Sequence, residues 1–512
     1  MYTIFCARVP LLHRLLIKLF LGACLILLGA AAQAQTSVGV GQDAVEQGKK
    51  LFSVQCAYCH GAEGKGDGEA SDILFPRPRD LTSGEFRLRS TPKGSPPLDA
   101  DLLKTITRGI PGSAMPGFAF LSESERLLLV QYVKTFSTRF AVPESRRKPP
   151  FDVAGQPAAS AELVTQGRQV YEKLQCGSCH GPEGRGDGPA VKTLQDDSGF
   201  PIAPRNFTTG PFKGGASVSD LFVRISTGME GTPMTSYGQL SEVERWQLAY
   251  YVRSLCRLPS CSAEANSGSG VVVSAHSRRG LPVDDPFAAS WSAAPQINIP
   301  MISLWNRSAS SPVLSVRSLN DEKTILFLVE WDDSTQDTST VRPQDFRDSV
   351  ALQFFTGPGN APIAMGDRNS EVTIWQWKAD WQAQIDTGHR TGVQDAHPFM
   401  IQSEYPLPAA AAREAGNQTA FAQRSSPIEE ATARGFGTIA PKPLAQQLVT
   451  GRGVWRDGRW HVVLTRKLAP QSGIDAAGRD NKISFAIWNG SEAQRNGEKA
   501  ISNWNALILA RK

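Results

Sequence analysis

The sequence predicts a multidomain protein in which two small all-α domains are followed by an all-β sandwich domain. One observation is a duplication: the stretch CAYCHGAEGKGDG, which begins at Cys56, returns as CGSCHGPEGRGDG at Cys176. The other is a change of pattern near residue 280, where helical periodicity gives way to short apolar runs rich in β-branched and aromatic residues. A chain of 512 residues is long enough for such an arrangement.

Residues 1–34 have the pattern of a cleaved secretory signal peptide. Three cations precede the apolar run LFLGACLILLGAAA, and the small-x-small cleavage pattern ends at Ala34. An uncleaved membrane anchor and a lipoprotein site at Cys24 are the alternatives. We therefore expect a periplasmic protein that has no integral membrane span after cleavage near Ala34.

The mature chain is expected to be nearly neutral. The whole chain has a net charge of +5, and much of that excess lies in residues 1–34, which contain no acid. No basic stripe follows, so we expect no nucleic-acid partner.

Cys-x-x-Cys-His is the attachment motif of c-type haem. Two thiols bind one edge of the porphyrin, and the adjacent histidine is thereby placed against the iron. A thioredoxin-like redox pair and a zinc half-site are the competing interpretations, but no βαβ unit and no second Cys/His pair at zinc-finger spacing lies nearby. The sequence predicts two covalent haem c groups, and their ligands are Cys56, Cys59, His60, Cys176, Cys179 and His180.

The duplication continues beyond the motifs, since LLKTITRGIPGSAMPGF matches LFVRISTGMEGTPMTSY. Met115 and Met234 occupy matching places in Gly- and Pro-rich loops, which predicts that each is the distal iron ligand. Met229 is the rival in the second copy, but it aligns with Ile110. His/Met ligation raises the reduction potential and leaves no open position on iron, so such haems carry electrons.

The helical periodicity supports a pair of similar domains. A helix is expected over residues 43–55, before the first motif, and the last helix of each copy should open with a capping box. The capping pairs are Ser122 with Glu125 and Ser241 with Glu244.

Both copies resemble class I cytochrome c domains across their full length. We place these domains at residues 43–140 and 160–258, with a Pro-rich, charged linker at 141–159. The resemblance implies that Arg79 and Arg205, in matched Pro-Arg dipeptides, lie near the haem propionates; surface loop arginines are the alternative.

Two cysteines remain outside the motifs and the signal peptide. Cys256 and Cys261 lie close together in CRLPSC. In an exported protein they are expected to form a small local disulfide, and two free thiols are the alternative.

The second half of the chain has the pattern of a β-sandwich. Short apolar runs alternate with polar turns such as LNDEK and GPGN. No cysteine follows Cys261, so a cofactor in this half would not be attached through thiols. The expected strands are PVLSVRS, TILFLVEW, SVALQFF, VTIWQW, WHVVLTRKL and ISFAIWNG.

Four segments of this half resemble the haem-binding γ subunit of ethylbenzene dehydrogenase, to which the γ subunits of dimethylsulfide dehydrogenase, selenate reductase and chlorate reductase are related. The segments are FRDSVALQFF, PIAMGD, VTIWQWKADWQ and ISFAIWNGSEAQRNGEKAISNW. The resemblance runs from about Asp284 to the C-terminus, and we place the domain at residues 280–512. It is interrupted by an apparent insertion, AAAAREAGNQTAFAQRSSPIEEATARGFG.

The resemblance implies one non-covalent haem b, held by Met365 and Lys499. A lysine binds iron only as the neutral amine, so its pKa must be lowered by burial and by the metal. Lys467 is the rival ligand. His389 and His397 are fallback ligands within a polar segment.

No catalytic constellation, molybdenum signature or iron–sulfur cysteine set is present in the sequence. We expect a multihaem electron-transfer protein rather than an enzyme by itself. Its expected partners are the molybdopterin and iron–sulfur subunits of a molybdenum oxidoreductase and a redox partner in the respiratory chain. The alternatives are a self-contained haem enzyme and cytochromes fused to a ligand-binding β-sandwich.

Overall fold

The computed structural model describes most of the chain after the expected signal peptide. The signal segment, Cys24, Cys261, His389 and His397 lie outside the described residues. In the part that is described, no helix is both long enough and apolar enough to cross a bilayer. The described residues are 41–209, 212–257, 270–278, 280–305, 312–357, 359, 361–363, 365–388, 425–469, 472–477 and 480–512.

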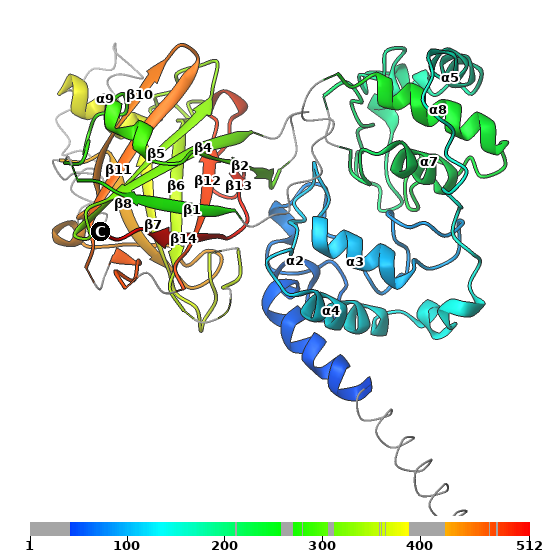
Figure 1. Cartoon of the computed structure of the whole chain (residues 1–512), viewed down its shortest axis with the longest axis horizontal. Coiled ribbons are helices and arrows are strands. Elements are labelled where there is room, and N and C mark those ends of the chain that lie inside the picture. Colours follow the sequence, from blue (N-terminus) through cyan, green and yellow to red (C-terminus); the bar gives the residue numbers. More distant parts are fainter. Residues whose placement is uncertain are drawn as a thin grey trace, which may run out of the picture.

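Two helical domains of the same design follow one another (Figure 1). The first contains a helix over residues 41–55, α2 (Ala57–His60), α3 (Asp99–Arg108) and α4 (Glu123–Thr135). The second contains α5 (Ala161–Lys173), α6 (Gly177–His180), α7 (Val218–Thr227) and α8 (Glu242–Ser254). Both expected capping boxes are present, at the starts of α4 and α8.

The first and last helices of each helical domain cross at a glycine. A Cβ atom on Gly48 would lie 2.2 Å from the backbone oxygen of Leu128 on α4. A Cβ atom on Gly167 would lie 2.0 Å from the backbone oxygen of Gln247 on α8. Because both contacts are with backbone, a larger residue forces the helices apart.

We expect Gly48→Ala to destabilise the first helical domain by about 1–3 kcal/mol, since the added methyl group overpacks the crossing. Gly41→Ala, on the same helix, is the matched control because no atom lies within 4 Å of its added Cβ. Thermal unfolding followed by haem absorbance measures the difference. Equal melting temperatures for the two variants would show that the crossing is not close-packed.

The C-terminal part, here called the sheet domain, is built on one extensively hydrogen-bonded sheet. The strand order is β10-β11-β5-β4-β1-β14-β12-β6-β7-β8-β9, with β2, β3 and β13 attached at the side. The six expected apolar runs are all strands, namely β4, β5, β6, β7, β11 and β12. The strands are β1 (Val271–His276), β2 (Ile297–Pro300), β3 (Ile302–Ser303), β4 (Val313–Asn320), β5 (Thr324–Asp332), β6 (Ser349–Phe355), β7 (Val372–Lys378), β8 (Ile428–Ala433), β9 (Ala440–Pro441), β10 (Thr450–Arg456), β11 (Arg459–Lys467), β12 (Lys482–Trp488), β13 (Ala500–Ile501) and β14 (Asn505–Leu509), and helix α9 (Ala379–Thr387) follows β7.

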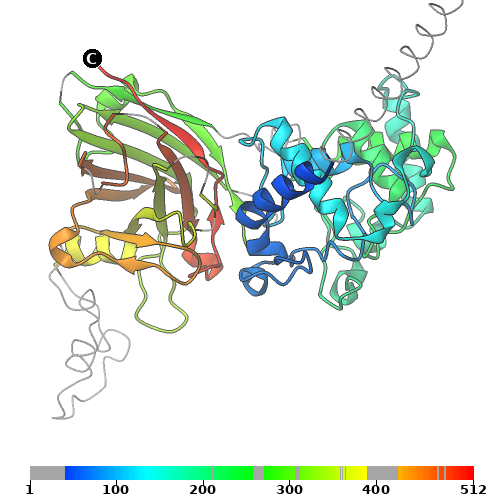
Figure 2. The same cartoon turned by 90° about the horizontal axis from the view of Figure 1, so that it is seen from below.

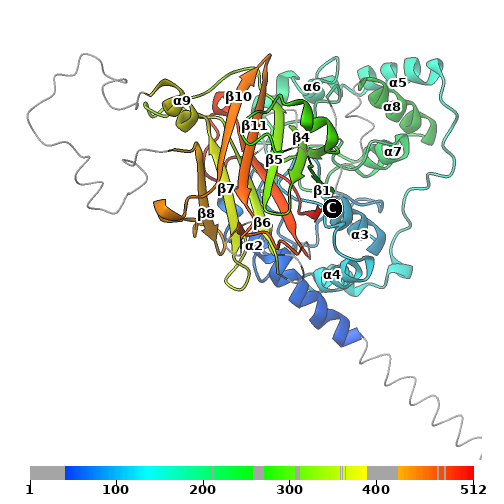
Figure 3. The same cartoon turned by 60° about the vertical axis from the view of Figure 1, so that its left-hand side comes forward.

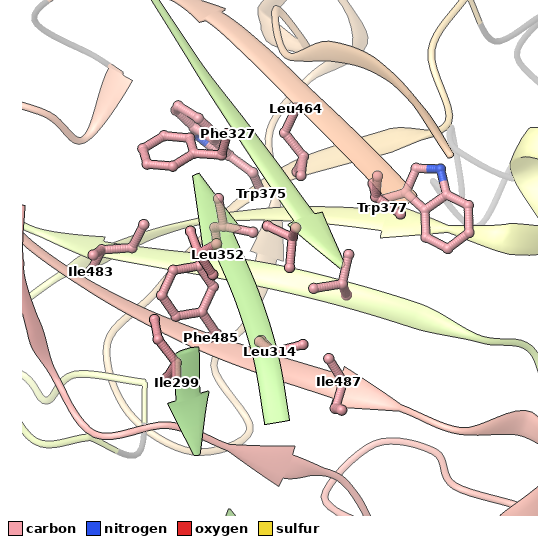
Figure 4. Close-up of a cluster of buried hydrophobic side chains, with 14 of the residues drawn as sticks. Ile299, Leu314, Phe327, Leu352, Trp375, Trp377, Leu464, Ile483, Phe485 and Ile487 are labelled. Atoms are coloured by element: carbon pink, nitrogen blue, oxygen red, sulfur yellow. The ribbon is translucent and has the colours of Figure 1, made fainter. Parts of the chain in front are cut away.

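The sheet curls until its two halves pack face to face, which gives a sandwich (Figures 1 and 3). The ring centroid of Phe327 on β5 lies 6.1 Å from that of Trp375 on β7. The ring of Trp460 on β11 lies 4.8 Å from that of Trp377 on β7. These strand pairs are not neighbours in the sheet, so the aromatic side chains join its two halves across the core that Figure 4 shows.

The sheet includes two segments that the sequence pattern did not identify as strands. β1 lies ahead of the expected domain start at residue 280, and it pairs in parallel with β14 and β4. β8 lies within the apparent insertion, yet it pairs along its length with β7. Residues 428–433 are therefore part of the sheet rather than an insertion.

The first helical domain contacts both other domains. Its Arg87 pairs with Asp196 of the second helical domain at 3.0 Å. Its Phe75 N–H donates to the backbone oxygen of Leu304 in the sheet domain at 3.0 Å, and the Phe75 ring lies 5.6 Å from that of Trp305. Figure 2 shows the dark blue N-terminal helices next to the sheet domain.

Cys256 is disulfide-bonded, as the sequence predicts. Its expected partner, Cys261, lies outside the described residues.

Candidate haem sites

One cavity of about 1200 Å³ extends through all three domains. Both Cys-x-x-Cys-His motifs line it, as do Met115, Met234, Met365 and Lys499. The structure therefore brings every expected iron ligand to the wall of a single cavity, although the ligands are spread over more than 400 residues of sequence.

The proximal histidines are oriented by backbone carbonyl groups. The Nδ1 atom of His60 lies 2.9 Å from the backbone oxygen of Arg79, and Nδ1 of His180 lies 3.3 Å from that of Arg205. A neutral imidazole that donates from Nδ1 presents a free Nε2 lone pair. Burial lowers the pKa of both histidines, which favours this neutral form.

The loops of Met115 and Met234 share one backbone conformation. The N–H of Ile110 donates to the oxygen of Met115 at 3.1 Å, and the N–H of Met229 donates to that of Met234 at 3.0 Å. The alignment of Met229 with Ile110 is therefore reproduced in three dimensions. Met229 also lines the cavity, but its place in the hydrogen-bond pattern differs from that of Met115.

Arg79 and Arg205 also line the cavity, in addition to accepting hydrogen bonds from the histidines through their backbone oxygens. The Arg79 guanidinium donates to the backbone oxygen of Glu85 at 3.0 Å. It also lies against Gly231 of the second helical domain, where an added Cβ would be 2.7 Å from it. A contact of either arginine with a propionate stays a prediction.

Positive side chains dominate the charged lining of the cavity. Ten Arg and Lys residues line it, against Glu429 as the one carboxylate among the described lining residues. Several of these cations have protein partners, such as Arg87 with Asp196. Burial, together with the nearby cations Arg87 and Arg205, lowers the pKa of Lys213 to about 8. Such a wall fits a cofactor that brings carboxylates, and haem carries two propionates.

We expect Lys213→Met to lower the reduction potential of a c-type haem by roughly tens of millivolts. Removal of a nearby positive charge destabilises the reduced state, which carries one more electron. Lys192→Met, at an exposed site in the same domain, is the control. Spectroelectrochemical titration of the two variants measures the reduction potentials. An unchanged or higher potential for Lys213→Met would contradict the placement of the Lys213 charge beside a c-type haem.

Met365 and Lys499 meet in the sheet domain. Nζ of Lys499 lies 3.9 Å from Sδ of Met365 and 5.1 Å from the ring centroid of Trp488. Burial lowers the pKa of Lys499 to about 8, which favours the neutral amine that a metal ion requires. Met365 has φ = 74°, an uncommon conformation for a residue with a side chain, so the surrounding loop holds its backbone in place.

Small side chains form part of the floor of this region of the cavity, beside Gln353 and Trp488. Ser349 and Ala351 on β6, and Ser484 and Ala486 on β12, line the cavity from two adjacent strands. Their size leaves space for a flat ring system above the sheet. Lys467, the rival ligand, is exposed at the end of β11 and does not line the cavity.

The residues present fit two haem c groups and one haem b. Each c-type site combines two thiols, a half-buried histidine whose neutral form is favoured and a methionine. The third site combines a thioether, a half-buried amine and several small side chains. The positive lining supplies counter-ions for propionates. This fit rests on the donor atoms and on the shape of the cavity.

Sequence reasoning missed the residues that join the three sites. None of these residues is an expected haem ligand, yet all of them line the cavity: Tyr58, Lys213, Leu304 and Phe436. The sequence offered a signal only for Tyr58, which occupies one of the variable positions of the first motif.

Comparison with known proteins follows the same division. The cytochrome c family model matches residues 45–137 and 164–256, and the ethylbenzene dehydrogenase family model matches residues 288–500. A Haloferax mediterranei protein provisionally named a respiratory nitrate reductase heme subunit is 28% identical over 228 residues, which are 43% of this chain and 66% of that protein. This chain thus matches slightly less than two thirds of that relative's length.

Two further proteins are similar to parts of the chain. The dimethylsulfide dehydrogenase subunit gamma of Rhodovulum sulfidophilum is 26% identical over 241 residues, which are 43% of this chain and 73% of that protein. A solved chain of the Kuenenia stuttgartiensis reducing HAO-like protein complex is 45% identical, with 41% of this chain and 96% of that chain covered and a TM-score of 0.40. From the family matches, the chain consists of two tandem cytochrome c domains followed by a domain of the ethylbenzene dehydrogenase family.

Proposed function

We propose that this protein is a three-haem electron-transfer subunit of an oxidoreductase complex. The observation that carries the proposal is the single cavity that both Cys-x-x-Cys-His motifs, both distal methionines and the Met365/Lys499 pair line together. Bound haem supplies reversible one-electron chemistry. Sites that share one cavity suit the passage of electrons between them.

The residues of the chain perform the supporting tasks. The backbone oxygens of Arg79 and Arg205 hold His60 and His180 in the orientation that leaves Nε2 free. Met115 and Met234 would each supply a thioether to one c-type haem, and an iron held by both a histidine and a methionine would have no open position for a substrate. The largely apolar wall limits water around the sites, and its cations offset the charge of the propionates.

The proposed partner complex is a molybdenum oxidoreductase with molybdopterin and iron–sulfur subunits. This rests on the similarity to the heme subunit and the subunit gamma described above. The signal-like N-terminal sequence supports a periplasmic location for the proposed complex, and the proposed acceptor or donor at the other end of the electron path is a respiratory-chain protein. One of these relatives is named for a reductase and the other for a dehydrogenase, so the direction of flow is left open.

We expect the mature protein to contain two covalent haems and one extractable haem b. Pyridine haemochrome spectra recorded before and after acid–acetone extraction measure the c-to-b ratio, for which the proposal requires about two to one. A spectrum that contains only the c-type signal would contradict the proposed haem b site. Rapid binding of carbon monoxide to the reduced native protein would instead favour a self-contained haem enzyme, because it requires an open iron position.

A further inference from the structure

Resting on the proposed function, we propose that the three haem sites form a line in the order b, c1, c2. Here b is the Met365/Lys499 site, c1 is the site of the first motif and c2 is the site of the second. Site c1 is the direct redox neighbour of b, and the motif of c2 faces the solution, where an external redox protein can reach it.

A ring contact joins the first motif to the loop of Met365. The ring centroid of Tyr58, inside the motif, lies 6.0 Å from that of Phe436 in the sheet domain. Phe436 follows Gly435, whose N–H donates to the backbone oxygen of Met365 at 3.0 Å. The Tyr58 hydroxyl is buried and has no hydrogen-bond partner among the described residues, so the contact is one of apolar packing.

A second contact joins the first motif to Lys499. Leu304 packs in a small cluster with Cys59, Tyr58 and Ala114. Its N–H donates to the backbone oxygen of Lys499 at 2.9 Å, and its own oxygen accepts from the N–H of Phe75 at 3.0 Å. Lys499 is therefore hydrogen-bonded through its backbone to Leu304, which packs on the first motif. Met365 is hydrogen-bonded through its backbone to Gly435, whose neighbour Phe436 packs on the first motif.

The second motif differs at the corresponding position. Ser178 stands where the first motif has Tyr58, and Ser178 is exposed. Its hydroxyl donates to the sulfur of the adjacent Cys179, at a distance of 3.9 Å. The variable position that packs on the sheet domain in c1 therefore carries an exposed side chain in c2.

The first helical domain also adjoins the distal side of c2. Its Arg79 guanidinium lies against Gly231, in the loop that carries Met234. Its Arg87 pairs with Asp196, and its Arg89, whose side chain is fully buried, pairs with Glu230 at 2.9 Å. Site c1 thus has the b site on one side and c2 on another, which sets the order of the line.

Pulsed EPR on the oxidised full-length protein tests this order directly. Met115→His and Met234→His each keep a ligand on iron, and they change the spectrum of c1 or of c2 and so assign the signals. We expect the iron–iron distance between b and c1 to be shorter than that between b and c2. A b-to-c2 distance equal to or shorter than the b-to-c1 distance would overturn the order.

Electron exchange between b and the c haems tests the Tyr58 contact. We expect Tyr58→Ser, which gives the first motif the residue found in the second, to slow exchange in stopped-flow experiments that follow the b and c absorption bands. Ser53→Ala, an exposed change in the same domain, is the control. An unchanged rate in Tyr58→Ser would refute the role of this contact.

These results separate the order from the proposed function. Absence of haem b from the wild-type protein would contradict both the proposed three-haem function and the proposed order of the sites. Three haems in the expected ratio, with b nearest to c2, would leave the electron-transfer function standing and would reject only the order.

Discussion

Lys499→Ala is expected to convert haem b to a high-spin form or to release it from the protein, while both c haems stay low-spin and attached. The substitution removes the amine that lies 3.9 Å from the Met365 sulfur and leaves a void in a buried site. Absorption and EPR spectra of the oxidised variant, with extraction of non-covalent haem, measure the change. The effect should be large because Lys499 supplies the one amine recorded against the Met365 sulfur among the described residues.

Lys467→Ala is the matched control because Lys467 is exposed and lies outside the cavity. If Lys467→Ala gave the high-spin haem b and Lys499→Ala did not, the ligand assignment would be exchanged. Acid should reproduce the Lys499→Ala spectrum. Protons compete with iron for the amine lone pair, whose pKa is about 8 without the metal, so coordination is favoured at high pH and is lost as the pH falls.

Met115→Ala and Met234→Ala are each expected to open one c-type iron without detaching its haem, since the thioether bonds are untouched. Each variant should lose part of the long-wavelength Met–Fe(III) absorption band and should have a lower reduction potential at one haem. Visible spectra of the oxidised protein and redox titration measure both effects.

Met229→Leu is the control for the second site. Met229 lines the cavity, but its hydrogen-bond position is that of Ile110 rather than that of Met115. If Met229→Leu diminished the band and Met234→Ala did not, the distal ligand of the second site would be Met229. A full band in both Met115→Ala and Met234→Ala would reject the matched-loop argument altogether.

The features that the sequence predicted well are local in the chain. Capping boxes at Ser122 and Ser241 require only residues three positions apart, and the attachment motifs are contiguous. The apolar runs of β4, β5, β6, β7, β11 and β12 carry their own signal of buried strand. Duplication added a further check, because Met115 and Met234 could be compared with each other.

The features that the sequence could not show depend on packing between distant segments. β8 reads IEEATA, which has no strong strand pattern, and its pairing with β7 gives it its place in the sheet. Leu304 and Phe436 have no distinguishing pattern in the sequence, and their role becomes visible only from their packing against the first helical domain. The cluster that Arg87 forms with Lys213 likewise arises only when their two domains come together.

The close packing of the first helical domain over the Met365/Lys499 site has a consequence for how the protein matures. Tyr58 and Leu304 belong to different domains, yet both line the cavity in which the non-covalent haem would lie. A haem b in this cavity would contact both domains, so haem binding would favour the closed arrangement of the domains and closure would favour haem binding. Binding and closure are then thermodynamically linked, so that each strengthens the other by the same free energy. In a protein produced under haem limitation, a chain without haem b would lack one redox site. Its domains would also be held together less firmly, so more sites would be exposed to proteases.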